Sequence, residues 1–126
     1  MEDKLTGLKV LIVDDDERNT FALVSYLETL DVKISVAASG FETIDLLKSG
    51  CAYDIILLDM MMPGMDGYET LAELGKNESW KKIPVLAVTA KAMKGDEEKC
   101  REAGAWDYVS KPIDMQLLIE KMTQWV

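Results

Sequence analysis

Five short apolar runs recur along the chain, and each is separated from the next by a segment long enough for a helix. Their apolar residues are continuous rather than alternating, so we expect strands that are covered on both faces, as in a parallel sheet. The runs are KVLIV (9–13), VKISVA (32–37), DIILL (54–58), PVLAV (84–88) and WDYV (106–109). This order predicts five strand–helix units, (βα)5, joined by right-handed crossovers.

The segments between the runs carry apolar residues at helical spacing, and helices on both faces of the sheet make a doubly wound α/β fold. Ser39 and Glu42 have the capping-box spacing that starts a helix, and Asp66 and Glu69 repeat it. The segment at about 93–103, MKGDEEKCREA, has few large apolar residues, so we expect its helix to be poorly anchored and a candidate moving part. The expected apolar faces comprise Phe21, Val24, Leu27 and Leu30 within 17–30; Phe41, Ile44 and Leu47; Tyr68, Leu71 and Leu74; and Leu117, Leu118 and Met122 within 114–124.

Length and charge limit the classes of function. At 126 residues the chain fits a single domain, 1–126. Its 14 Lys and Arg residues against 23 Asp and Glu residues give a net charge of -9, which argues against nucleic acid or an anionic membrane as a direct partner. Because the chain has neither an apolar run near ~20 residues nor a signal peptide in MEDKLTG, we expect a cytoplasmic location.

The chain has no histidine and two cysteines, Cys51 and Cys100. The missing histidine excludes Ser-His and Cys-His nucleophile pairs, histidine metal sites and a phosphorylated histidine within this chain. Two isolated thiols make neither a zinc site nor a disulfide framework. We therefore expect both cysteines to be small buried hydrophobic residues.

Polar residues follow the carboxyl ends of four of the expected strands. They are Asp14, Asp15 and Asp16 after the first, Asp59 after the third, Thr89 after the fourth, and Ser110 and Lys111 after the fifth. In an open α/β sheet these ends meet at one edge, and ligands bind there where the strand order reverses. If the first and third strands are neighbours, ~4.8 Å apart, Asp14 and Asp15 face Asp59.

Carboxylates placed so closely repel one another, by about 3 kcal/mol for two charges ~5 Å apart at an effective dielectric near 20. Such a group favours a hard divalent cation, and Mg²⁺ suits one or two carboxylates plus a phosphate oxygen. Thr89 can donate a hydrogen bond to a phosphoryl group, and Lys111 can neutralise one of its oxygens. Asp59 is then the nucleophile that takes the phosphoryl group as a mixed anhydride.

Four blocks of sequence closely resemble the signature of the receiver domain of bacterial two-component response regulators. They are VLIVDDD, IILLDMMMPGMDG, VLAVTA and YVSKP, in the family's order and spacing. The resemblance covers about residues 8–124 and implies the flavodoxin-like, CheY-like sheet with strand order 2-1-3-4-5. The stretch TAKAMKGDEEKCREAGAWDYVSKP looks most like receivers found within hybrid sensor histidine kinases.

The resemblance also implies a role for each matching residue at the metal and acceptor site. Asp59 matches the phosphoacceptor, and Asp14 and Asp15 match the acid pair that holds Mg²⁺ together with Asp59. The backbone carbonyl of Met61 matches the third protein ligand of the metal. Met61 and Lys91 occupy the two positions that vary beside the site, and a methionine cannot orient an attacking water, so we expect slow self-dephosphorylation.

The remaining matches concern the phosphoryl group and the response to it. Thr89 and Lys111 match the phosphoryl-binding pair, and Tyr108 matches the switch aromatic that turns inward when Thr89 moves. The bond from Lys111 to Pro112 matches one that is usually cis. The implied function is a phosphorelay, in which a histidine kinase or histidine phosphotransfer protein donates to a monomer or weak homodimer and the surface of the fourth helix and fifth strand shifts.

Other interpretations of the same residues remain. Asp16 is also explained as an acid at a helix N-terminus, and Asp66 as an N-cap rather than a ligand. Met60, Met61, Met62 and Met65 are explained by packing in the core and its loops. An Mg²⁺-dependent aspartyl phosphatase of the haloacid-dehalogenase kind would have a second Asp where Met61 stands, and a docking module that never turns phosphate over would not need the full set of site residues.

Overall fold

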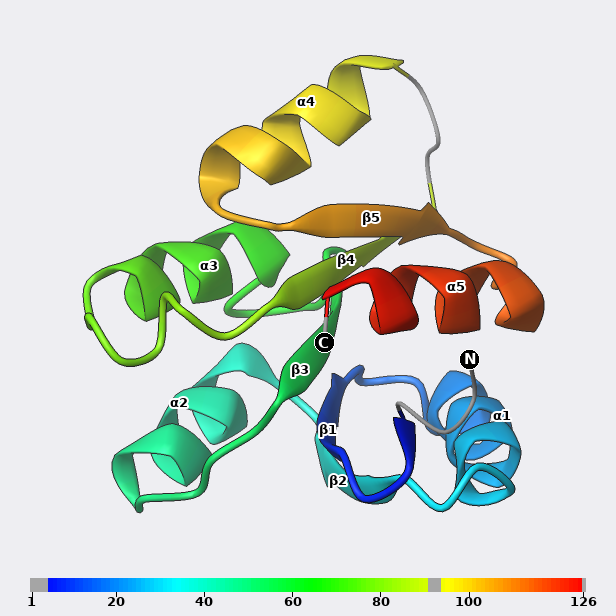
Figure 1. The fold of residues 1–126 in the computed structure, drawn as a ribbon. Coiled ribbons are helices and arrows are strands. Elements are labelled where there is room, and N and C mark those ends of the chain that lie inside the picture. Colours follow the sequence, from blue (N-terminus) through cyan, green and yellow to red (C-terminus); the bar gives the residue numbers. More distant parts are fainter. Residues whose placement is uncertain (1–4, 91–93, 126) are drawn as a thin grey trace.

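The computed structural model describes residues 5–90 and 94–125, and within them five parallel strands form one sheet flanked by helices (Figure 1). The strand order is β2-β1-β3-β4-β5, so the α/β fold and the strand order expected from the sequence are confirmed. The strands are β1 (Lys9–Val13), β2 (Lys33–Ala37), β3 (Ile55–Asp59), β4 (Val85–Thr89) and β5 (Asp107–Ser110). The helices are α1 (Glu17–Glu28), α2 (Gly40–Lys48), α3 (Gly67–Gly75), α4 (Lys94–Ala103) and α5 (Met115–Trp125).

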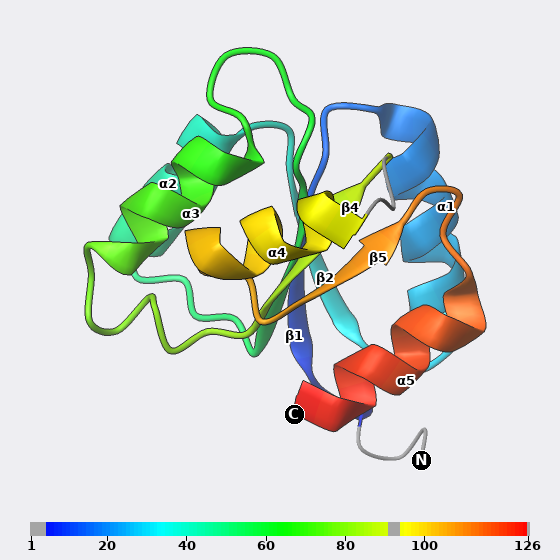
Figure 2. The same ribbon diagram turned by 90° about the horizontal axis from the view of Figure 1, so that it is seen from above.

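The helices cover the sheet on two sides. Helices α1 and α5 lie on one face, and α2, α3 and α4 lie on the other (Figures 1 and 2). Side chains of β3 alternate between the two resulting cores: Ile55 and Leu57 pack with α1 and α5, and Ile56 and Leu58 pack on the opposite face. The central strands are therefore covered on both faces, which is why their sequences are apolar without interruption.

Edge strand β2 departs from that expectation. Only its last residue, Ala37, is buried, and the side chain of Val36 is 41% exposed. The strand pairs with β1 alone, because the sheet ends at this edge. An apolar run can therefore describe an edge strand as well as a central one, and the sequence pattern did not separate the two.

The apolar faces predicted for the helices are confirmed in part. Leu27, Leu71 and Leu74 are buried, but Phe21 is 73%, Phe41 59% and Leu117 42% exposed. Residues three apart drift by about 60° around a helix with 3.6 residues per turn, so a stripe with strict three-residue spacing leaves the core face. The side chains that remain on that face include Leu23 and Leu27 in α1, Ile44 and Leu47 in α2, and Leu118 and Met122 in α5.

The helix starts follow their capping signals. Asp66 caps α3 through a capping box with Glu69, as expected. Ser39 accepts a hydrogen bond from the Glu42 amide at 3.1 Å, whereas the Glu42 carboxylate accepts from Ala38 and not from Ser39. The alternative interpretation of Asp16 is confirmed as well, because its side chain accepts a hydrogen bond from the backbone amide at position 18 as the N-cap of α1.

Helix α4 is attached to the domain by few apolar side chains. Among its described side chains, Cys100 is buried in the core and Ala103 is partly buried against it. The expectation for Cys51 was wrong, since its thiol is exposed 3.5 Å from the Ser49 hydroxyl in the turn after α2. Among the helices of the described ranges, none has the length and apolar character that crossing a bilayer requires.

Candidate functional site

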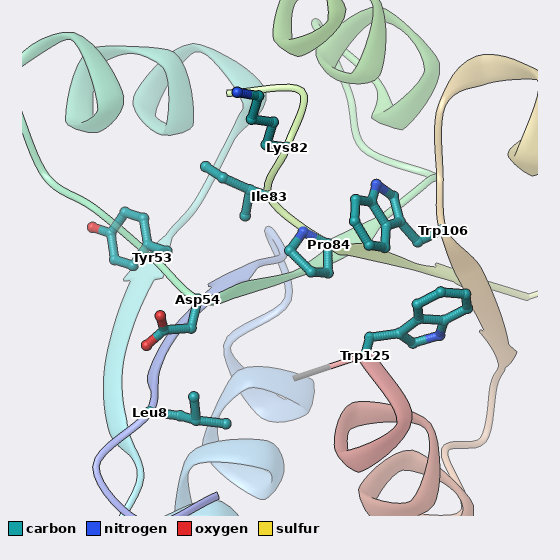
Figure 3. A pocket seen from close by; sticks show the side chains of 8 residues that line it. All are labelled: Leu8, Tyr53, Asp54, Lys82, Ile83, Pro84, Trp106 and Trp125. Carbon is teal, nitrogen blue, oxygen red and sulfur yellow. The ribbon is translucent and has the colours of Figure 1, made fainter. Parts of the chain in front are cut away.

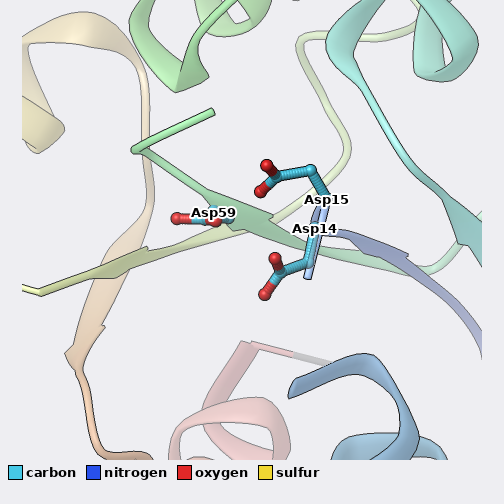
Figure 4. A group of neighbouring side chains, drawn as sticks. All are labelled: Asp14, Asp15 and Asp59. Atoms are coloured by element: carbon cyan, nitrogen blue, oxygen red, sulfur yellow. The ribbon is translucent and has the colours of Figure 1, made fainter. Parts of the chain in front are cut away.

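Three carboxylates gather at the carboxyl edge of the sheet. Asp14 and Asp15 directly follow β1, and Asp59 is the last residue of β3 (Figure 4). The two strands are adjacent, with Val13 opposite Leu58, so the next residue on each strand is an acid. One oxygen from each of the three carboxylates lies within 4.8 Å of the others, and the expected juxtaposition is confirmed.

The two buried acids are held by backbone amides. Asp14 is 6% and Asp59 2% exposed, whereas Asp15 is exposed. One oxygen of Asp14 accepts a hydrogen bond from the Asp16 amide at 2.8 Å, and one oxygen of Asp59 accepts from the Met61 amide at 3.0 Å. Each carboxylate is thereby fixed in orientation by the turn that follows its own strand.

Lys111 brings a positive charge to the second oxygen of both buried acids. Its Nζ lies 3.4 Å from Asp59 Oδ2 and 4.0 Å from Asp14 Oδ2. The backbone amide of Lys111 donates to the Thr89 carbonyl at 2.8 Å, which ties the end of β5 to the end of β4. The bond from Lys111 to Pro112 is cis, as the resemblance implied.

The electrostatics of the site disfavour a second buried negative charge. Burial raises the pKa of Asp14, and the charge of Asp59 raises it further. The Asp16 amide and the Lys111 ammonium oppose this shift, but the direction remains upward. A carboxylate held in this way gains from any additional cation, since a cation within a few ångströms favours the charged form.

Thr89 lies at the same edge of the sheet. It ends β4, is 7% exposed, and stands opposite Ser110 in the register with β5. The preceding residue on β4, Val88, is the register partner of Asp59, so Thr89 lies one residue further along its strand than Asp59. The residues that the sequence predicted to supply a hydroxyl and an ammonium therefore both lie at the sheet edge that carries the acids.

Tyr108 is the second residue of β5, on the face of the sheet that packs beneath α4. The Lys121 ammonium stands 4.8 Å from the centre of its ring, and Glu97 of α4 lies close enough to act on its hydroxyl electrostatically. Burial raises the pKa of Tyr108, and the charge of Glu97 contributes in the same direction. The other position of interest near β4, Lys91, lies outside the described residues.

Met61 contacts Asp59 through its backbone amide, and its side chain is exposed to solvent. Its amide binds Asp59, and its side chain is 63% exposed, so packing does not explain this methionine. Met60 and Met62 are buried at 2% and 6%, as the packing interpretation expects. The role of the Met61 carbonyl as a metal ligand stays a prediction.

A buried ion cluster on β5 was missed by the sequence analysis. Asp107 is 5% exposed and accepts from Lys121 at 2.9 Å, Arg101 at 3.2 Å and the Trp125 indole at 3.2 Å. Burial alone would raise its pKa, but the hydrogen bonds from Lys121, the Tyr108 amide and Trp125 lower it overall. An acid inside an apolar strand run was the available signal. Its partners lie on α4 and α5, and their positions depend on the tertiary fold.

A hollow lined by two tryptophans lies at the opposite end of the sheet from the acids. It has a volume of about 470 Å³ and includes two tryptophans whose rings meet edge to face at 5.4 Å (Figure 3). Its walls are formed by Leu8, Tyr53, Asp54, Lys82, Ile83, Pro84, Trp106 and Trp125. The three carboxylates of the cluster do not line this hollow.

The comparisons with known proteins agree with this geometry. Residues 10–123 match the family model of the response regulator receiver domain. The chain is 38% identical over 117 residues to the polar-differentiation response regulator DivK of Brucella ovis, covering 93% of this chain and 94% of that protein. The chain belongs to the response regulator receiver domain family, and it functions in phosphorelay signal transduction.

Two solved structures are informative about the site. The receiver domain of sensor histidine kinase PA1611 of Pseudomonas aeruginosa is 32% identical with a TM-score of 0.82, covers 95% of this chain and 98% of its own, and holds a magnesium ion in its active-site cleft. A chain from the complex of the Saccharomyces cerevisiae phosphotransfer protein Ypd1 with the receiver domain of Ssk1 is 26% identical. Its TM-score is 0.88, and the match covers 96% of this chain and 90% of that one.

Proposed function

We propose that Asp59 is the phosphoacceptor of this receiver domain and that the donor is a phosphohistidine of a histidine kinase or histidine phosphotransfer protein. The observation that carries the proposal is the meeting of three carboxylates within 4.8 Å beside the Lys111 ammonium. The complex of Ypd1 with the Ssk1 receiver domain supports the class of partner. Within this chain histidine is absent, so the donor belongs to another protein or to another part of a longer one.

The donor set fits Mg²⁺. Carboxylate oxygens are its preferred protein ligands, and an exposed acid next to two buried ones leaves room for water and a phosphate oxygen. Asp14, Asp15, Asp59 and the backbone carbonyl of Met61 would hold the ion. When bound, Mg²⁺ neutralises the charge that accumulates between the acids and the incoming phosphoryl group.

The residues of the chain then have separate tasks in the transfer. The Asp59 carboxylate, oriented by the Met61 amide, forms a bond to phosphorus as the bond from phosphorus to the donor nitrogen breaks. Lys111 stands 3.4 Å from the acceptor carboxylate and neutralises charge on the transferred group. The Thr89 hydroxyl donates a hydrogen bond to a phosphoryl oxygen from the end of the neighbouring strand.

The response is carried from Thr89 to the surface of α4 and β5. Tyr108 is the switch residue, and an inward turn of its ring would give up the contact with Lys121. Among its described side chains, α4 contacts the core through Cys100 and Ala103, so a shift of this helix should cost little free energy. The chain therefore acts as a signalling domain that catalyses only its own phosphorylation and dephosphorylation.

The acceptor assignment is tested with a small-molecule donor. Wild-type protein incubated with Mg²⁺ and acetyl phosphate should gain the mass of one phosphoryl group, and Asp59→Asn should gain none. Asp16→Asn is the matched control, because Asn is an equally good N-cap and the acceptor remains. A phosphoryl adduct of undiminished yield on Asp59→Asn would overturn the assignment.

The dephosphorylation rate tests the role of Met61. Its exposed side chain cannot orient a water, so Met61→Asn should shorten the half-life of the phosphoryl group by about a hundredfold, the lower end of the range for a positioned polar group. Met61→Leu preserves an apolar side chain and should leave the half-life unchanged. A half-life that is unaltered or longer in Met61→Asn would contradict this role.

A further inference from the structure

A hydrophobic cleft lies between α1 and the edge strand β2. Phe21 and Val24 of α1 form one wall, and Val36 and Ala38 form the other, around a volume of about 430 Å³. Phe21 and Val36 are two of the six large hydrophobic side chains that are exposed in the described part of the chain. We name this feature the α1–β2 cleft.

The exposure of Phe21 is a consequence of how α1 is oriented. Leu23 and Leu27 take the core positions, so the helix turns Phe21 outward until it is 73% exposed. β2 is the last strand on this side of the sheet, and α5 lies on the far side of α1 (Figure 2). Burying an exposed aromatic side chain of this size is favourable, so a partner that covers the cleft gains binding energy from it.

The negative charge around the cleft indicates which kind of partner could bind there. Asp14, Asp15 and Glu17 border it at the end nearest the acceptor site. A second copy would bring a chain of net charge -9 and the same acidic border into contact, and nucleic acid or an anionic membrane would meet the same repulsion. A polypeptide with basic side chains next to apolar ones is complementary to both the acidic border and the apolar walls of the cleft.

We propose that the α1–β2 cleft binds an amphipathic basic helix of a partner protein. Phe21 and Val24 stand three positions apart and form a ridge along α1, against which a helix can lay apolar side chains at positions i, i+3 and i+4. Lysine or arginine side chains at one end of that helix would meet Asp15 and Glu17. This docking goes beyond phosphoryl transfer, because Phe21 and Val36 take no part in the transfer.

The cleft shares Asp14 and Asp15 with the carboxylate cluster at the acceptor site. A divalent cation bound between these acids would reduce the negative charge at the border of the cleft. Binding of the basic helix should then be weaker in Mg²⁺ than in a chelator, and by reciprocity the helix should weaken Mg²⁺ binding by the same factor.

The test uses a fluorescein-labelled synthetic helix of leucine and lysine with its leucines at positions i, i+3, i+4 and i+7, followed by fluorescence anisotropy. Phe21→Ser should weaken binding about tenfold, as for an anchor side chain at an interface. Phe41→Ser is the matched control, because Phe41 is 59% exposed and lies outside the cleft, so binding should not change. A peptide with the same composition but scrambled leucines, and one with glutamate in place of lysine, should bind weakly.

Several outcomes would overturn the proposal. These are equal affinity of Phe21→Ser and wild type, an equal loss in Phe41→Ser, or equal binding of the scrambled peptide. A wild-type dimer in sedimentation that Phe21→Ser abolishes would assign the cleft to a second copy instead, and binding to phosphatidylserine vesicles would assign it to a membrane. Phe21→Ser should still be phosphorylated by acetyl phosphate, so failure of docking and failure of the acceptor assignment are distinguishable.

Discussion

Replacing Asp59, the proposed phosphoacceptor, with asparagine should stabilise the metal-free protein. Asp59 is buried next to Asp14, which is buried as well, and the exposed Asp15 completes the cluster. Asp59→Asn removes one negative charge with almost no change in side-chain volume. Lys111 is left with a partner, because its Nζ lies 4.0 Å from Asp14. We therefore expect a higher free energy of unfolding for the variant in a chelator.

The magnitude follows from the distances. The oxygens of Asp14 and Asp59 lie within 4.8 Å of each other, and at that outer limit their repulsion is about 3.5 kcal/mol for an effective dielectric near 20. The attraction of Lys111 for Asp59 at 3.4 Å is about 5 kcal/mol on the same scale, and Asp15 adds a smaller, screened repulsion. These effects nearly cancel, so the desolvation of a buried carboxylate, several kcal/mol, decides the sign. We expect a net gain of about 2 kcal/mol in the variant.

Urea unfolding followed by circular dichroism measures this difference. The comparison needs wild type, Asp59→Asn and the surface control Asp45→Asn, each in a chelator and in excess Mg²⁺. The control should stay within about 0.5 kcal/mol of wild type. Mg²⁺ should stabilise wild type more than the variant, which has lost a ligand, and so narrow the difference. A lower free energy of unfolding for Asp59→Asn in the chelator would refute the reasoning, since the Lys111 attraction would then dominate.

Three further predictions concern the scaffold. Because the pKa of Asp107 is lowered in the folded state, its carboxylate contributes stability that is present above pH 3.8 and is lost as the pH falls through the folded-state pKa. The loss of stability with falling pH should therefore be less steep in Asp107→Asn than in wild type. At neutral pH, Asp107→Asn should melt about 10 °C lower than wild type. A Cβ at Gly67 would lie 2.5 Å from the Cα atom of Met60, the residue after β3, so Gly67→Ala should lower the free energy of unfolding in urea by about 2 kcal/mol. A Cβ at Gly75 would meet open space, so Gly75→Ala should not destabilise the protein. Ellman's reagent should titrate Cys51 in the native protein and Cys100 only after unfolding; two fast thiols in the native state would contradict the burial of Cys100.

The order of strands and helices could be predicted from the sequence because it depends on local patterns. Continuous apolar runs and capping residues act over a few positions, and both are visible without knowledge of the fold. The carboxylate cluster was also predictable, since its acids lie at or just after the ends of β1 and β3 and parallel strands end at a common edge. The motif blocks supplied the strand order, which the runs alone leave open.

The tertiary structure decided which side of each element is buried and what meets across the sheet. Phe21 and Leu117 belong to apolar stripes yet face solvent, because the rotation of a helix is set by packing and not by its own spacing. The partners of Asp107 come from α4 and α5, and no local pattern relates them. Local sequence thus determined the elements and the chemistry at their ends, whereas long-range packing determined the ion cluster on β5 and the exposed cleft beside α1.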